Sequence, residues 1–169
     1  MEQAAPKGVA LGGFMATGKS TVGPLLAQRL GLAFWDLDLE IERVSGSSIA
    51  DIFQEHGEPF FRELERRVLW KLVACAPCVL SLGGGSLHVE ANRTALHGFD
   101  VVVLHLPWET IENRLQFDSQ ERPLVAQAKR LYQQREPGYA RSGMLIDVEK
   151  LAPAEVVDLI CERVGLGAI

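Results

Sequence analysis

The sequence is poor in cysteine and aromatic residues and carries no excess of positive charge. Its 169 residues include three cysteines, and 7% are aromatic. Lysine and arginine total 17 against 22 aspartates and glutamates, which gives a net charge of −5. A broad electrostatic surface for nucleic acid or for an anionic membrane is therefore not expected. An odd number of thiols indicates free cysteines, and Cys75, Cys78 and Cys161 are expected to be buried and inert.

Long apolar runs, repeats and linkers are also absent. The first eight residues hold no apolar stretch, and glycines interrupt the run that follows, so neither a signal peptide nor a membrane-spanning helix is predicted. No repeat and no Pro/Gly/Ser-rich segment divides the chain. Without a signal peptide or a spanning helix, we expect a cytoplasmic protein. Since 47% of the residues are hydrophobic, we expect residues 1–169 to form a single domain with a substantial core.

What the chain has instead is an alternation of buried-strand and amphipathic-helix patterns. Strands are predicted at 9–14, 33–36, 79–82, 101–106 and 144–148. Helices are predicted at 20–30, 38–45, 48–56, 58–75, 90–96, 108–115, 124–135 and 154–164. Strands that alternate with helices indicate an α/β fold, in which a mostly parallel sheet is covered on both faces.

A phosphate-binding motif follows the first predicted strand. Residues 13–20 read Gly-Phe-Met-Ala-Thr-Gly-Lys-Ser and match G-x-x-x-x-G-K-[ST] at every fixed position. In such a loop the backbone N–H groups and the N-terminus of the next helix bind phosphate oxygens. Lys19 is expected to reach the β- and γ-phosphates, and the Ser20 hydroxyl to ligate Mg²⁺. The motif therefore predicts a bound nucleoside triphosphate with magnesium.

Two further groups of residues are expected at the same edge of the sheet. Asp36 and Asp38 end the second predicted strand, and three consecutive glycines at 83–85 follow the third. Ligands of an open parallel sheet bind outside the carboxyl ends of its strands, so these groups should face the phosphate loop. One aspartate could hold metal through water and the other a substrate hydroxyl; alternatively, Asp38 caps a helix that begins near Leu39. The glycines either allow a close backbone approach or form a plain flexible turn.

The order and spacing of the motifs are similar to those of the shikimate kinases, small P-loop proteins of the nucleoside-monophosphate-kinase-like group. The matching features extend from Gly13 to about Pro153. After the phosphate loop they are Phe34-x-Asp36-x-Asp38-x-x-Ile41-Glu42, Gly57-Glu58-x-x-Phe61-Arg62-x-x-Glu65, Gly83-Gly84-Gly85, Arg122-Pro123-Leu124 and Arg135-x-Pro137-x-Tyr139. Ala16 is a mild departure, because many relatives carry glycine there.

The resemblance implies a three-layer P-loop kinase fold with a central five-stranded parallel sheet in the order 2-3-1-4-5. It also implies a phosphate loop at 13–20, a helical substrate-binding subregion at about 38–75 and a mobile lid at about 117–127. The implied reaction moves the γ-phosphate of ATP to the 3-hydroxyl of shikimate, a step toward chorismate and the aromatic amino acids. The family also favours a monomer.

The resemblance further assigns roles to individual residues. The residues implied to bind the acceptor are Asp38, Arg62, Gly83, Gly84, Gly85 and Arg135. The two arginines would grip the carboxylate of shikimate, and Asp38 would accept from its ring hydroxyls and orient or deprotonate the attacking oxygen. The implied catalytic residues are Lys19, Asp38 and Arg122, of which Arg122 would be carried onto the γ-phosphate by the lid.

The remaining implied residues bind ATP and Mg²⁺. For ATP they are Gly13, Ala16, Thr17, Gly18, Lys19, Ser20, Thr21, Arg114, Arg122 and Pro153. The guanidinium of Arg114 would stack on the adenine, opposite the loop at Pro153. The metal would be held by the Ser20 hydroxyl and, through water, by Asp36.

Several alternatives stay open. Arg62 could pair only with Glu58 or Glu65 on its own helix, and residues 117–124 could form a plain surface loop. A kinase for gluconate or a nucleotide would share the phosphate loop, but the two arginines and the triple glycine favour shikimate. Outside enzymes, a related domain could bind the ligand and regulate a DNA-binding partner. The retained catalytic residues and the few residues before the first predicted strand argue against that role.

Overall fold

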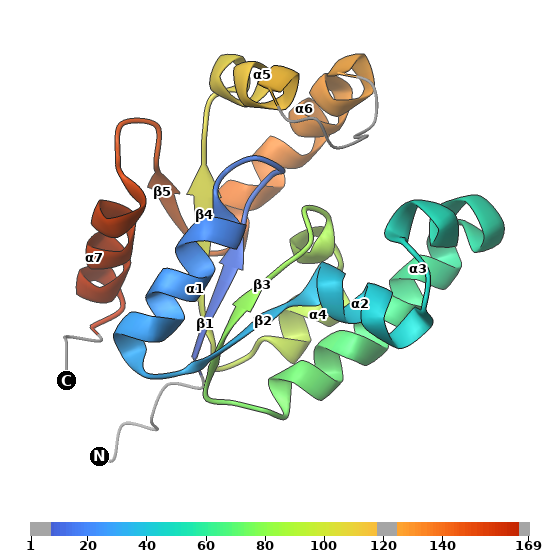
Figure 1. Cartoon of the computed structure of the whole chain (residues 1–169), viewed down its shortest axis with the longest axis horizontal. Coiled ribbons are helices and arrows are strands. Elements are labelled where there is room, and N and C mark those ends of the chain that lie inside the picture. Colours follow the sequence, from blue (N-terminus) through green and yellow to red (C-terminus); the bar gives the residue numbers. More distant parts are fainter. Residues whose placement is uncertain (1–7, 118–124, 166–169) are drawn as a thin grey trace.

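A five-stranded parallel sheet forms the centre of the computed structural model, which describes residues 8–117 and 125–165 (Figure 1). Its strands are β1 (Gly8–Gly12), β2 (Ala33–Asp36), β3 (Cys78–Ser81), β4 (Asp100–His105) and β5 (Met144–Asp147). Their order, β2-β3-β1-β4-β5, confirms the predicted one. The central strand β1 pairs on one side with β3, through Leu11 opposite Ser81, and on the other with β4, through Leu11 opposite Val102.

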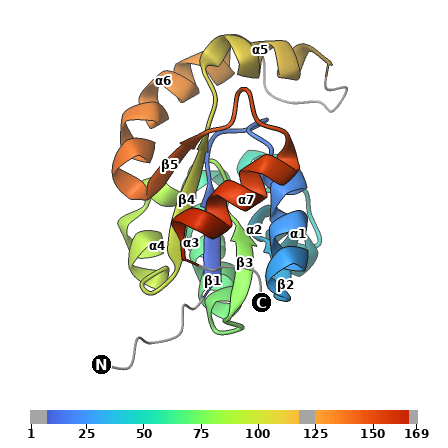
Figure 2. The same cartoon turned by 90° about the vertical axis from the view of Figure 1, so that its left-hand side faces the viewer.

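Helices cover both faces of this sheet. They are α1 (Lys19–Leu30), α2 (Leu37–Ser45), α3 (Ile49–Val73), α4 (Glu90–Ala95), α5 (Trp108–Phe117), α6 (Val125–Ser142) and α7 (Pro153–Arg163), with a short 3₁₀ helix, η1 (Ser86–His88). Helices α1 and α7 lie on one face, and α3, α4 and α6 lie on the other (Figures 1 and 2). None of the helices within the described ranges is long and apolar enough to cross a membrane.

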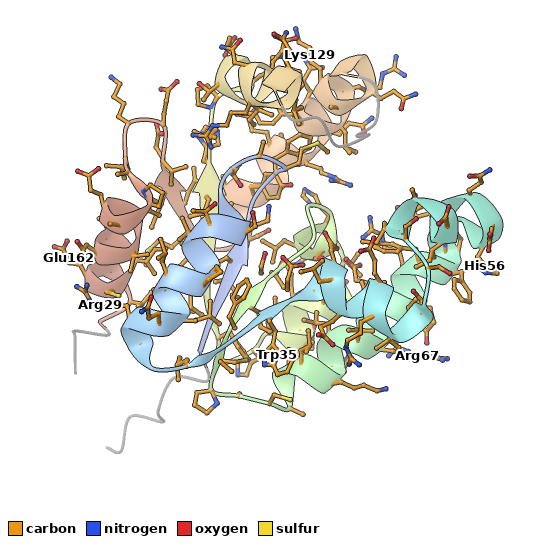
Figure 3. The ribbon with its side chains drawn as sticks, viewed as in Figure 1. Arg29, Trp35, His56, Arg67, Lys129 and Glu162 are labelled. Carbon is orange, nitrogen blue, oxygen red and sulfur yellow. The ribbon has the colours of Figure 1, made fainter. Side chains whose placement is uncertain are left out.

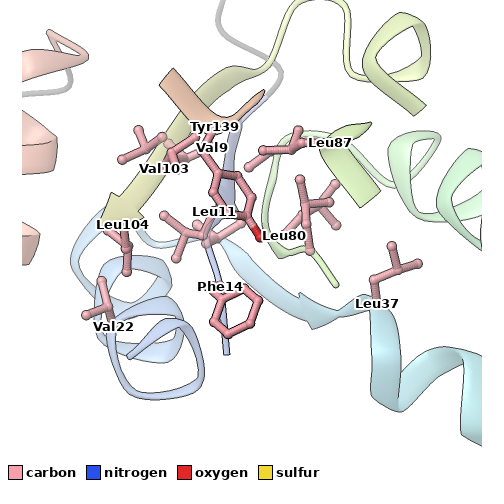
Figure 4. Close-up of a cluster of buried hydrophobic side chains, with 14 of the residues drawn as sticks. Val9, Leu11, Phe14, Val22, Leu37, Leu80, Leu87, Val103, Leu104 and Tyr139 are labelled. Atoms are coloured by element: carbon pink, nitrogen blue, oxygen red, sulfur yellow. The ribbon is translucent and has the colours of Figure 1, made fainter. Parts of the chain in front are cut away.

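The buried side chains of the sheet form the core. Every residue of β1 and β3 is buried, as expected for strands that are covered on both faces. Figure 4 shows Leu11, Leu80 and Leu104 of the sheet together with Phe14 of the phosphate loop and Tyr139 of α6. The phosphate loop and α6 are therefore anchored in one close-packed core, which limits their movement relative to each other.

Most charged side chains of the helices lie on their outer surfaces, away from the core. In Figure 3, Arg29 and Glu162 lie on the side of α1 and α7, whereas His56 and Arg67 lie on the far side of the molecule on α3. The three cysteines are free, as expected, but Cys75 is exposed, so the prediction of buried thiols holds only for the other two. Cys75 ends up in solvent because it follows the last turn of α3.

Two helices differ from their predicted bounds by more than two residues at an end. The segments predicted as separate helices at 48–56 and 58–75 form the single helix α3, bent at Gly57, whose φ of 79° lies in the left-handed region. The helix predicted at 124–135 continues to Ser142 as α6 and contains Pro137. A proline inside a helix removes one backbone donor and disfavours the helix locally, but α6 continues through Pro137. Arg135 consequently lies within α6.

The start of α2 decides between the two roles considered for Asp38. Asp36 is the N-cap, and its Oδ1 accepts a hydrogen bond from the backbone N–H of Leu39 at 3.1 Å. Asp38 therefore lies in the first turn of the helix and does not cap it, which leaves its carboxyl group available for the site. The next helix, α3, is capped by Ser48, whose Oγ accepts a hydrogen bond from the N–H of Asp51 at 3.1 Å.

Candidate active site

The carboxyl ends of β1, β2 and β3 bring three loops to one edge of the sheet (Figure 1). The phosphate loop follows β1, the turn into α2 follows β2, and the triple glycine follows β3. This edge is where ligands bind in open α/β sheets, because the loops diverge there from neighbouring strands. The topology therefore assembles the three motifs that the sequence carries far apart.

The backbone of the phosphate loop requires glycine at its two ends. Gly13 has a φ of 132°, and a Cβ there would overlap the carbonyl oxygen of Leu104. Gly18 has a φ of 98° and is the N-cap of α1, so the positive end of that helix points at the loop. The buried Thr17 donates from Oγ1 to the carbonyl of Phe14 at 2.8 Å and braces the loop from inside.

Ala16 is under backbone strain in this loop. Its φ of 63° is the only positive φ of a non-glycine residue in the described ranges, and a side chain in the left-handed region costs free energy. Arg114 of α5 donates from Nη1 to the carbonyl of Ala16 at 2.9 Å. The residue expected to stack on adenine therefore also holds the strained turn of the loop.

Lys19 lies between the backbone of the phosphate loop and Asp38. Its Nζ donates to the carbonyls of Gly13 and Phe14 at 2.8 and 2.9 Å. It is also close enough to Asp38 for its charge to lower the pKa of that carboxyl group. Ser20 and Thr21 follow it in the first turn of α1, where both side chains are exposed.

Asp38 is a half-buried carboxyl group with a strongly perturbed pKa. Burial, the largest cause, and the negative charge of Asp36 raise its pKa from 3.8 to about 6, with smaller contributions from Glu65 and Glu42. Lys19 acts in the opposite direction. A pKa close to neutrality suits a group that must accept a proton during a reaction.

The triple glycine passes between Asp38 and two arginines. A Cβ on Gly83 would lie 2.8 Å from Oδ1 of Asp38. A Cβ on Gly85 would lie 2.6 Å from Nη2 of Arg62 and 3.0 Å from Nη2 of Arg135. Larger residues would therefore displace these three side chains, so close approach explains the glycines and a plain flexible turn does not.

The two arginines form a concentrated positive site. Burial, the largest cause, lowers the pKa of Arg135, and the like charge of Arg62 lowers it further. Two guanidinium groups that repel each other beside bare backbone are suited to bind a carboxylate, which can accept from both planar forks. Arg62 also forms ion pairs with Glu58 and Glu65 on its own helix. The two alternatives considered for Arg62 therefore both hold, because it makes these pairs and also lies beside Gly85.

Tyr139 and His88 hold the glycine loop and Arg135 together. Burial raises the pKa of Tyr139 to about 12, so its hydroxyl keeps a proton and donates to the carbonyl of Gly84 at 2.5 Å. Burial also lowers the pKa of His88, and the neutral ring bonds through Nε2 to the carbonyl of Arg135 at 3.0 Å. The sequence analysis assigned no role in the site to Tyr139 or to His88.

The residues expected around the adenine lie on α5 and α7. Arg114 is in the last turn of α5, and Pro153 is the first residue of α7. Thr110 of α5 donates from Oγ1 to Glu149 Oε1 at 2.7 Å, which links α5 to the connection between β5 and α7. Arg122 and most of the segment expected as a lid lie outside the residues that the structure describes.

The side chains expected at the metal fit Mg²⁺ only if ATP and water supply most of its ligands. Within the described ranges no group of three or more His, Cys, Asp or Glu side chains could hold an ion. Mg²⁺ keeps several waters and commonly uses substrate phosphates and only one or two protein oxygens. The exposed hydroxyl of Ser20 and the carboxylate of Asp36, one oxygen of which is occupied by the cap, match that requirement.

The chain is similar to shikimate kinases in both sequence and structure. The family model described as shikimate kinase matches residues 15–165. A shikimate kinase of Persephonella marina is 39% identical over 163 residues, which cover 94% of this chain and 99% of the relative. The structure of a shikimate kinase from Acinetobacter baumannii in complex with shikimate has a TM-score of 0.87 at 32% identity and covers 96% of this chain and 94% of its own. The structure of the Aquifex aeolicus shikimate kinase has a TM-score of 0.81 at 36% identity, with 93% of this chain and 95% of its own covered.

Proposed function

This chain belongs to the shikimate kinase family, and from that premise we propose how its own residues move the γ-phosphate of ATP to the 3-hydroxyl of shikimate. The observation that carries the proposal is the placement of the glycine loop between Asp38 on one side and Arg62 and Arg135 on the other. Shikimate has a carboxylate at one end and hydroxyls at the other, so this separation of charges matches the substrate.

We assign the carboxylate end to the two arginines. Arg62 and Arg135 bind the carboxylate, and the backbone N–H groups of Gly83, Gly84 and Gly85 add donors from the loop between them. The ring hydroxyls then face Asp38, which accepts hydrogen bonds and orients the 3-hydroxyl. Such orientation supplies much of the rate in phosphoryl transfer, because the protein performs little covalent chemistry.

Asp38 is also the proton acceptor in this proposal. The oxygen of the 3-hydroxyl attacks the γ-phosphorus, its proton passes to the Asp38 carboxylate, and the bond between the γ-phosphorus and the bridging oxygen breaks to release ADP. The pKa of about 6 leaves Asp38 largely ionised at neutral pH while keeping it basic enough to take the proton. Lys19 stabilises the negative charge on the transferred phosphate.

The nucleotide is held by the phosphate loop. Gly13, Ala16, Gly18 and Thr21 present backbone to the phosphates, Thr17 braces the turn, and Arg114 and Pro153 flank the adenine. When Mg²⁺ is bound, it neutralises phosphate charge; Ser20 would hold it directly and Asp36 through water. Arg122, outside the described residues, is proposed to reach the γ-phosphate from a lid at about 117–127.

The wider context follows from the same chemistry. We propose that residues 1–169 form one domain that acts as a monomer in the cytoplasm, with its acceptor bound by the subregion at about 38–75. The net charge of −5 argues against nucleic acid or an anionic membrane as a partner. The three free thiols are consistent with a reducing compartment.

Separating binding from transfer tests these roles. Asp38→Asn should abolish shikimate-dependent ADP release while ATP still binds, because the amide cannot take the proton. Arg62→Lys should instead raise the KM for shikimate about ten- to hundredfold, since one point charge replaces a planar fork. Steady-state kinetics and nucleotide titration measure both. Near-normal turnover of Asp38→Asn would remove Asp38 from its role, and an unchanged shikimate KM in Arg62→Lys would remove Arg62.

A further inference from the structure

A cluster of buried polar side chains contacts Arg62. It consists of Glu65 on α3, Ser86 in η1 and Asn92 on α4, and we call it the Glu65 cluster. Glu65 is 1% exposed, and Ser86 and Asn92 are 0% exposed. Burying a carboxyl group is costly unless hydrogen-bond donors surround it, so the donors around Glu65 are needed for its burial.

Each oxygen of the Glu65 carboxylate has a donor from this cluster. Ser86 Oγ donates to Oε1 at 2.5 Å, and Asn92 Nδ2 donates to Oε2 at 3.2 Å. Asn92 Nδ2 also donates to the carbonyl of Ser86 at 3.1 Å, whereas its Oδ1 is buried without a partner in the described part of the chain. The amide is therefore oriented by its donors, because the reverse orientation would set its carbonyl against the carboxylate.

The same carboxylate holds the guanidinium of Arg62. Arg62 Nη1 donates to Glu65 Oε2 at 2.9 Å, whereas the contacts of Arg62 with Glu58 are 3.3 Å long and the Glu58 side chain is 64% exposed. An exposed partner holds a flexible side chain weakly, so Glu65 is the fixed point for Arg62. Ser86 ties the cluster to the glycine loop as well, because its N–H donates to the carbonyl of Gly83 at 3.0 Å.

We propose that Asn92 and Ser86 are positioning residues for the substrate carboxylate. They touch neither shikimate nor ATP. By fixing the Glu65 carboxylate they hold Arg62 in its binding orientation before shikimate arrives, so that less side-chain freedom is lost on binding. This inference rests on the role proposed above for Arg62.

Two substitutions remove the donors singly. Asn92→Leu replaces the amide with an apolar side chain of similar size, and Ser86→Ala removes one hydroxyl. Each should raise the KM for shikimate about tenfold, the size expected when a hydrogen bond to a charged group is lost. The KM for ATP and kcat at saturating shikimate should stay within about twofold, because Lys19 and Asp38 are unchanged.

A matched control separates positioning from a general loss of stability. Val157→Ala removes buried methyl groups from α7, on the opposite side of the sheet from α3 (Figure 1). It should lower the melting temperature at least as much as Ser86→Ala and leave the shikimate KM unchanged. Where Asn92→Leu folds poorly, Ser86→Ala and direct shikimate titration of the folded protein carry the test.

The outcomes distinguish this inference from the proposal that it rests on. A higher shikimate KM in Ser86→Ala and Arg62→Lys, with no change in Val157→Ala, supports the positioning role. An unchanged KM in Ser86→Ala together with a raised KM in Arg62→Lys overturns only the inference about the Glu65 cluster. An unchanged KM in Arg62→Lys overturns the proposed role of Arg62, and the positioning role with it. Equal losses of kcat and of ATP affinity in the cluster variants would show a merely structural role.

Discussion

Asp38 combines a functional advantage with a cost in stability. Its burial and the neighbouring carboxylates of Asp36, Glu65 and Glu42 raise its pKa, against the opposing charge of Lys19. A carboxyl group with a pKa raised in the folded protein stabilises the fold only while it is protonated. Above its folded pKa, at neutral pH, that contribution is lost, so the proposed proton acceptor is held in the site at the expense of stability.

Asp38→Asn should therefore increase the free energy of unfolding while it removes activity. The shift from 3.8 to about 6 corresponds to a gain of roughly 2–3 kcal/mol at pH 7, as an upper bound. The gain should shrink as the pH falls through the folded pKa and vanish below the unfolded one, where the wild-type carboxyl group is also neutral. Urea unfolding of both proteins at several pH values measures this difference.

The control for that experiment is Asp158→Asn. Asp158 is an exposed partner of Arg29 at 2.8 Å, so its replacement should change stability by less than about 1 kcal/mol and should not increase it. A gain in Asp38→Asn that stays constant between acid and neutral pH would contradict the assigned pKa.

Ala16 provides a second prediction at the scale of one residue. Because its φ is 63°, Ala16→Gly should relieve left-handed strain of about 1–2 kcal/mol, partly offset by the greater freedom of glycine in the unfolded chain. We expect a net gain of about 0.5–1 kcal/mol in urea unfolding. Ala50→Gly, at an exposed position in the first turns of α3, should have the opposite sign. A loss of stability in both variants would show that Ala16 is unstrained.

At the scale of elements, the loop between β3 and η1 depends on its lack of side chains. Gly85 has a φ of −100°, which alanine adopts readily, so Gly85→Ala should fold normally. Its Cβ would nevertheless push the tips of Arg62 and Arg135 aside. We expect the shikimate KM to rise about ten- to hundredfold with little change in ATP affinity.

Gly84→Ala is a graded comparison for this prediction. A Cβ there would lie 3.0 Å from Nη1 of Arg135 and 3.8 Å from the hydroxyl of Tyr139, and Arg62 is not among its nearest neighbours. Its effect on the shikimate KM should therefore be smaller than that of Gly85→Ala. Equal shikimate KM values in the two variants and the wild type would show that the loop does not lie against the acceptor.

The individual loops and helices also show which parts of the structure could be predicted from the sequence. The phosphate loop was predictable because its function depends on the backbone, and the backbone requirement leaves glycines at fixed spacing. The cluster of Glu65, Ser86 and Asn92 could not be predicted, because these three polar residues lie on separate elements and become neighbours only when α3 and α4 pack together. The full length of α6 was missed for a related reason: packing of that helix against η1 and the sheet outweighed the local stop signal at Pro137.

At the scale of the whole molecule, the strand order turns a linear set of motifs into one site. With β1 between β3 and β4, the phosphate loop lies beside the glycine loop (Figure 1). Helix α6 packs against η1 and brings Arg135 next to Gly84 and Gly85. Alternating strands and helices predicted the parallel sheet, whereas the strand order came from the resemblance to a family and not from the hydrophobic pattern. The central claim about the molecule is therefore that the two loops hold ATP and a small hydroxylated carboxylate face to face.

The most direct test of that claim is the choice of acceptor. ADP release from Mg-ATP would be measured with shikimate, quinate, gluconate or AMP as the acceptor and with no acceptor. The mass of the product would be determined by mass spectrometry. We predict rapid turnover that depends on shikimate and yields shikimate carrying one additional phosphate. If no acceptor exceeds the blank while ATP still binds, or if gluconate or AMP exceeds shikimate, the proposed arrangement of Asp38, Arg62 and Arg135 around the acceptor is wrong.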